Sequence, residues 1–217
     1  MTPCQEPGPL EELRGTVKSY GRHAIALAGW TTWKARIEEQ DDLLGSMARS
    51  TKDAADRVTP KPKFTATRTE PAGDGIDVLV FPDQVVYRGL TEETWTRVLD
   101  QHLVGGTVVE DLSPEPVTGH HITVCMHGAR DARCGACGPL LANALEEAIE
   151  VRGLEDVHVH RSSHVGGHRF AGNVLVYPGG AWYGYVRPGD VETLLDHVEK
   201  GSRWEAHHRG EMVGPQS

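Results

Sequence analysis

Residues 122–139 read ITVCMHGARDARCGACGP, and residues 163–173 read SHVGGHRFAGN. The first segment is an apolar run that ends on a cysteine and is followed by two more cysteines and a Gly-Pro pair. The second segment is a glycine-rich loop that contains two histidines. Cysteine and histidine side chains gathered between a strand end and such a loop indicate a metal or cluster site.

The composition indicates a soluble globular protein, with 38% hydrophobic and 24% charged residues. A net charge of −9 does not suit a nucleic-acid partner, which requires clustered lysine and arginine. No apolar run approaches the roughly 20 residues of a membrane span, and the first residues do not resemble a signal peptide. We therefore expect a cytoplasmic protein that binds neither membrane nor nucleic acid. Clustered cysteines in such a protein are metal-binding or catalytic, and the distant Cys4 is expected to be a free surface thiol.

The same order of elements is predicted twice along the chain. In each half a strand, a helix and a second strand precede a hairpin and a final helix. The first half has these elements at 23–28, 32–50, 64–69, 77–88 and from residue 91. The second half has them at 121–124, 139–152, 157–160, 174–186 and 190–200. Pro139 suits the first turn of its helix, so Cys134 and Cys137 are expected to precede that helix.

Residue identities support a duplication. The segment VLVFP at 78–82 matches VLVYP at 174–178, an offset of 96 residues. Gly21 and His23 match Gly119 and His121 at an offset of 98, which places Leu27 opposite Cys125. By element order this is the layout of the thioredoxin-like fold. We predict an α/β protein with two tandem thioredoxin-like lobes (1–104 and 119–203), a linker (105–118) and a polar, frayed tail (204–217), the second lobe binding the cofactor.

Three kinds of site fit these residues. Two cysteines and two histidines can hold a [2Fe–2S] cluster in which histidine replaces two thiolates, as in Rieske centres. The same residue types can hold zinc in a zinc-stabilised binding module, although the eight residues between Cys125 and Cys134 are more than zinc fingers use. Cys134 and Cys137 can also form the redox dithiol of a thiol–disulfide oxidoreductase.

Several motifs together resemble the sucrase/ferredoxin-like family, whose members are thioredoxin-like [2Fe–2S] ferredoxins. They are the Cys-x8-Cys spacing with Arg130-Asp131 inside it, the segment HVGGHRFAGNV at 164–174, Pro-Gly-Gly at 178–180 and Tyr183-Gly184. The resemblance covers residues 119–200. It implies four cluster ligands, Cys125, Cys134, His164 and His168, and it leaves Cys137 as an alternative ligand.

The resemblance also implies an electron carrier rather than a stand-alone enzyme, working with an unidentified reductase or acceptor protein. Neutral imidazoles raise the reduction potential above that of all-cysteine plant-type clusters. They can also lose a proton on oxidation, which couples electron transfer to proton transfer. Around the ligands, Asp131 is expected either to bind a ligand histidine or a loop amide or to act only as a turn former. Arg169 is expected to offset cluster charge, to contact a partner or to stay solvated, and Asn173 to cap or brace the loop.

Overall fold

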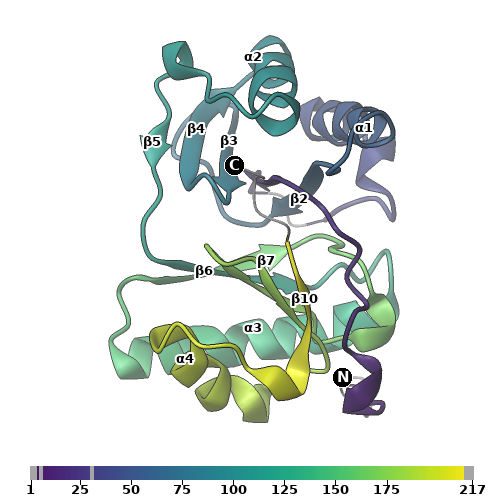
Figure 1. Ribbon diagram of the computed structural model, residues 1–217, viewed down its shortest axis with the longest axis vertical. Coiled ribbons are helices and arrows are strands. Elements are labelled where there is room, and N and C mark those ends of the chain that lie inside the picture. Colours follow the sequence, from purple (N-terminus) through teal and green to yellow (C-terminus); the bar gives the residue numbers. More distant parts are fainter. Residues whose placement is uncertain (1–3, 5–6, 30–31, 213–217) are drawn as a thin grey trace. The chain divides into compact units, whose positions relative to one another are not determined.

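A computed structural model describes residues 4, 7–29 and 32–212. The chain is of mixed α/β type and divides into two compact units (Figure 1). The described residues of the N-terminal unit lie within Ser19–Thr118, together with Met212. Those of the C-terminal unit are Gly119–Glu211 together with Cys4 and residues 7–18. No helix in the described part of the chain is long and apolar enough to cross a membrane.

The N-terminal unit is a five-stranded sheet with helices α1 and α2. Its strands, in spatial order, are β2 (Lys63–Thr67), β1 (His23–Leu27), β3 (Ile76–Phe81), β4 (Val85–Leu90) and β5 (Glu115–Pro116). Only the β1–β2 pair is parallel. Helix α1 (Leu43–Ala55) begins after Asp42, whose side chain accepts a hydrogen bond from the amide of Gly45 at 2.8 Å. Helix α2 (Glu92–Arg97) begins after the cap Thr91 and continues as a π-helix over Val98–Val104.

The C-terminal unit repeats this arrangement of strands. Its sheet has the order β7 (Val157–Ser162), β6 (His120–Cys125), β8 (Val174–Tyr177), β9 (Ala181–Tyr183) and β10 (His208–Glu211). Strands β6 and β7 are parallel, and the remaining pairs are antiparallel. Helices α3 (Ala132–Arg152) and α4 (Val191–Glu199) pack against each other beside this sheet (Figure 1). Their apolar faces and the strands form a core that includes Leu141, Leu145, Leu194 and Leu195.

The strand registers follow the two offsets seen in the sequence. In β1, His23 lies opposite Phe81 of β3, and in β6, His121 lies opposite Tyr177 of β8. The hairpins agree as well, because Val78 faces Tyr87 as Val174 faces Tyr183. Strand β1 accordingly ends on Leu27 where β6 ends on Cys125.

Two helices differ from the sequence-based expectation. The helix expected at 32–50 is α1 at Leu43–Ala55, because Asp42 caps it there. Residues 30 and 31, next to its expected start, lie outside the described residues. The helix expected to start at Pro139 begins about two turns earlier, after Asp131, whose carboxylate accepts a hydrogen bond from the amide of Arg133 at 3.0 Å. Pro139 is therefore inside α3, and both Cys134 and Cys137 lie within the helix rather than before it.

The expected boundaries differ most at the end of the chain. Residues 204–217 were expected to form a frayed polar tail, yet β10 lies within them and pairs with β9. Strand β10 is ordered because polar side chains of this segment find buried partners: Arg209 is only 2% exposed. The expected linker contains β5, which pairs with β4.

Candidate metal centre

The two candidate cysteine ligands come from adjoining elements. Cys125 is the last residue of β6, and Cys134 is the third residue of α3. Both side chains are buried, at 1% exposure each. Gly138 lets α3 approach the strand end, because a Cβ at this position would collide with the carbonyl of Cys125. The two thiols therefore lie close together at the N-terminal end of α3, where the positive end of the helix dipole stabilises thiolates.

The two sulfur atoms have opposite tendencies to ionise. A hydrogen bond from Cys134 holds the pKa of Cys125 well below its ordinary value; burial opposes this, and His164 and the amide of Val165 add further hydrogen bonds. The hydrogen bond to Cys125, together with burial, raises the pKa of Cys134. Of the two thiols, Cys125 therefore loses its proton more readily, and the thiolate is the species that binds metals. The contact with His164 also shows that the histidine loop reaches the end of β6.

The loop between β7 and β8 carries both histidines. Their ring centroids are 5.5 Å apart with an interplanar angle of 33°. The loop needs glycine at positions 166 and 167, whose φ angles are 110° and 68°. His127 accepts a hydrogen bond from the amide of His164 at 3.2 Å, and Asn173 donates one to the carbonyl of Gly167 at 3.0 Å. Asn173, which was expected to brace this loop, thus contacts it through one side-chain hydrogen bond.

An unpaired atom on each histidine fits a bound metal group. Nδ1 of His164 and Nδ1 of His168 are buried, and neither has a hydrogen-bond partner among the described residues. Buried polar atoms are seldom left unpaired, because the cost is roughly 1–3 kcal/mol each. Coordination of a metal would use both atoms. Among the described residues no three His, Cys, Asp or Glu side chains are arranged to hold a single ion. A [2Fe–2S] cluster requires only two protein ligands on each iron.

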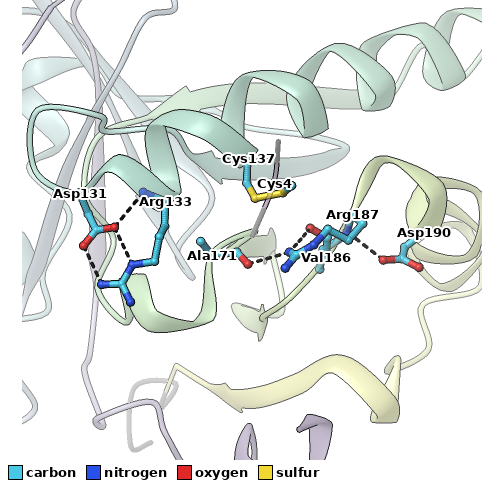
Figure 2. The surroundings of a disulfide bond; sticks show 8 residues. All are labelled: Cys4, Asp131, Arg133, Cys137, Ala171, Val186, Arg187 and Asp190. Atoms are coloured by element: carbon cyan, nitrogen blue, oxygen red, sulfur yellow. Dashed lines mark hydrogen bonds and ion pairs between the residues drawn. A yellow bond between two sulfur atoms is a disulfide. The ribbon is translucent and has the colours of Figure 1, made fainter. Parts of the chain in front are cut away.

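Cys137 forms a disulfide bond with Cys4, a residue 133 positions away in the sequence (Figure 2). The expectation that Cys4 is a free thiol is therefore wrong in this structure. The sequence offered no local signal for this pairing, because the two residues are far apart along the chain. While it is paired with Cys4, Cys137 cannot serve as the alternative ligand or as the partner of Cys134 in a dithiol. Cys125 and Cys134 are the free cysteines.

Asp131 supports the start of α3 and lies beside one histidine. Its carboxylate accepts two hydrogen bonds from the guanidinium of Arg133, at 2.9 and 2.8 Å (Figure 2). The side-chain hydrogen bond from Arg133 is the main reason that the pKa of Asp131 is lowered to about 2. One oxygen lies 3.8 Å from Nε2 of His168. Arg169, by contrast, is exposed, with its guanidinium 4.4 Å from the ring centre of Phe170.

The family described as Sucrase/ferredoxin-like matches residues 13–210. The chain belongs to the Sucrase/ferredoxin-like family. The match extends across both units, whereas the motifs seen in the sequence lay mainly in the second half.

Relatives of this sucrase/ferredoxin-like chain include fungal proteins named Altered inheritance of mitochondria protein 32. The one from Debaryomyces hansenii is 37% identical over 108 residues, which are 47% of this chain and 39% of that protein. The one from Meyerozyma guilliermondii is 33% identical over 109 residues, which are 48% of this chain and 39% of that protein. These two matches span about two fifths of the relatives' own length. The one from Clavispora lusitaniae is 27% identical over 232 residues, covering 93% of this chain and 84% of that protein.

A thioredoxin-like [2Fe–2S] ferredoxin from Aquifex aeolicus is among the solved structures that are similar to this chain. The TM-score is 0.40 and the identity 22%, over 46% of this chain and 99% of the ferredoxin.

Two residues near the site were missed by sequence reasoning. His127 lies between the two candidate cysteines in the sequence; it is 2% exposed, and its Nδ1 accepts a hydrogen bond from the amide of His164. Arg209 lay in the expected tail and was not considered. No local pattern marks Arg209, because its burial depends on Phe170 and Trp182, which are distant along the chain.

Replacing Asp131 by alanine is expected to destabilise this sucrase/ferredoxin-like protein by about 1 kcal/mol at neutral pH, the usual cost of a lost N-cap. The folded-state pKa of about 2 lies below the ordinary 3.8, so this stabilisation is present above about pH 4 and is lost as the pH falls toward 2. Urea unfolding of the iron-free protein at pH 7 and pH 2 measures both effects. Alanine at the exposed neighbour Arg130 is the control. Equal midpoints for D131A and R130A at pH 7 would contradict the capping role.

Proposed function

We propose that this sucrase/ferredoxin-like protein is a one-electron carrier that holds a [2Fe–2S] cluster on Cys125, Cys134, His164 and His168. The observation that carries the proposal is the convergence of two buried sulfur atoms with two buried ring nitrogens that have no hydrogen-bond partner in the described part of the chain. The hydrogen bond between His164 and Cys125 brings the two halves of this ligand set together. Family membership supports the same conclusion.

The cluster would supply one-electron chemistry. The surrounding residues would determine from which side a redox partner reaches the cluster and which charges lie near it. Both cysteines are buried, while the side chain of His168 is 42% exposed. The histidine edge is therefore the side from which a redox partner would receive or deliver the electron. If Nδ1 is the ligand atom, Nε2 remains to carry a proton, and Nε2 of His168 lies near Asp131. We accordingly include coupling of electron and proton transfer in the proposal.

The same proposal covers the whole chain. Both units are taken as thioredoxin-like lobes, of which the N-terminal one is a copy without ligands, since β1 ends on Leu27. The partner is a reductase or acceptor protein of unknown identity, and the compartment proposed from the composition is the cytoplasm. The net charge of −9 suits a partner with a basic docking face.

Freshly purified protein is expected to be red-brown, with about two irons and two inorganic sulfides per chain. Absorption spectra, metal analysis and electron paramagnetic resonance of the reduced sample measure this. A zinc-stabilised module would be colourless and contain zinc. A dithiol oxidoreductase would contain no metal and would reduce insulin disulfides, a reaction expected to be absent from the iron-loaded protein. Either result would refute the proposed function.

A further inference from the structure

Arg209 of β10 is a buried cation in the C-terminal unit. It is 2% exposed, and its guanidinium carbon lies 4.5 Å from the ring centre of Phe170 and 5.4 Å from that of Trp182. Two glycines make room for it. A Cβ at Gly184 would crowd the aliphatic part of the side chain, and one at Gly167 would collide with the guanidinium. The pocket is therefore built around this arginine.

The hydrogen bonds of Arg209 are to neutral groups. Nε donates to the hydroxyl of Thr16 at 3.1 Å, and Nη1 donates to the side-chain oxygen of Asn173 at 2.6 Å. No carboxylate of the described residues lies within 4.0 Å of its guanidinium nitrogens. A buried charge without an opposite charge is costly, and such charges are normally paired or act at a site. Burial first, and then the charge of Arg169, lower the pKa of Arg209 to about 10, and Cys125 acts to raise it. The side chain is thus still a cation at neutral pH, in the electrostatic field of a ligand sulfur.

Asn173 connects this cation to both parts of the candidate centre. Its side-chain oxygen accepts from Arg209, and its side-chain nitrogen donates to the carbonyl of Gly167, between the two histidines. Its backbone carbonyl accepts from the amide of Cys125 at 3.1 Å. Arg209 is therefore held at a fixed place relative to the strand end and the histidine loop.

We propose that Arg209 is a positioning residue whose fixed positive charge stabilises the reduced form of the centre and so raises its reduction potential. The inference rests on the proposed function. Two ferric ions, two sulfides, two thiolates and two neutral imidazoles have no net charge, and uptake of one electron makes the set singly negative. A cation in a buried site favours the negative state over the neutral one. Arg209 has no carboxylate partner among the described residues, and the negative charge that the centre gains on reduction would balance its positive charge.

The test compares the reduction potentials of iron-loaded wild-type protein with those of R209M and R209K. Methionine fills similar space without charge, whereas lysine keeps the charge and loses the planar hydrogen bonds. R209M is expected to lose about tenfold in the equilibrium constant for reduction, which is about 59 mV for one electron. R209K is expected to have a reduction potential close to that of the wild-type protein. R169M removes an exposed neighbouring charge and should change the potential little.

Each outcome distinguishes an electrostatic role of Arg209 from a purely structural one. Cluster loss in R209M alone, with R209K loaded and near the wild-type potential, would also support a requirement for charge. Full loading of R209M at an unchanged potential would overturn the inference and leave the proposed function intact. Cluster loss in both variants would show that Arg209 has a structural role, and it would also overturn the inference. Wild-type protein that takes up no iron would refute the proposed function itself.

Discussion

Serine in place of Cys125 or Cys134 is expected to remove nearly all bound iron, whereas serine in place of Cys137 should leave most of it. The first two side chains are the free, buried sulfur atoms beside the histidine loop. A hydroxyl is a poor substitute for a thiolate ligand, so loss of either sulfur removes one of only two protein ligands on an iron. Iron per chain and the visible absorption of each purified variant measure the effect.

Cys4 provides a matched control for this series. C4S breaks the same disulfide as C137S, but it does not touch helix α3. Both variants should retain iron to a similar degree, because neither sulfur belongs to the proposed ligand set. Loss of the cluster in C137S together with retention in C134S would reverse the assignment and make Cys137 the ligand. Loss in both C4S and C137S would instead show that the disulfide supports the site.

The similarity of the two strand arrangements could be predicted because the same elements and residue identities recur along the chain. The offset of 98 residues aligns His23 with His121, the offset of 96 aligns Phe81 with Tyr177, and these residues occupy equivalent paired positions in the two units. The ligand candidates were visible for the same reason, since Cys125 ends an apolar run and the histidines flank a glycine pair. Such patterns are local, so a single sequence is enough to recognise them.

Features that depend on contacts between distant residues could not be predicted. The start of α3 was misplaced because Pro139 is a strong local signal for a first turn, while the cap at Asp131 depends on one side-chain hydrogen bond. The disulfide joins residues 133 positions apart. The burial of Arg209 depends on Phe170 and Trp182, and in sequence this arginine looks like any charged residue near a chain end. Arg209, the buried charge near the site, therefore could not be recognised from the sequence.

The stability of the C-terminal unit is expected to fall steeply as the pH drops below about 6.5, because of a buried histidine pair. Nδ1 of His121 on β6 and Nε2 of His160 on β7 are 2.8 Å apart, and the two rings are stacked at an interplanar angle of 5°. His160 is 5% exposed. Burial first, and then the charges of His121 and His158, lower its pKa to about 3.

The free energy of unfolding falls in acid because the unfolded chain binds a proton more readily than the folded chain does. The unfolded chain takes up a proton at His160 near pH 6.5, whereas the folded chain resists protonation until about pH 3. Stability is therefore unaffected by His160 above about pH 6.5 and is lost progressively between about pH 6.5 and 3. At about 1.36 kcal/mol per pH unit, the loss over this range is at most about 5 kcal/mol. That is a large part of the stability of an ordinary domain.

Urea unfolding of iron-free protein from pH 8 to pH 4 tests this expectation without a contribution from cluster loss. H160Q keeps a hydrogen-bonding group beside His121 but cannot titrate, so its stability should vary much less with pH between 6.5 and 4. H120Q removes a less buried histidine at the start of β6, next to His121, and should keep the wild-type slope. If H160Q retained that slope, the proton uptake that destabilises the fold would belong to another group, and burial of this ring would not limit the stability of the unit in acid.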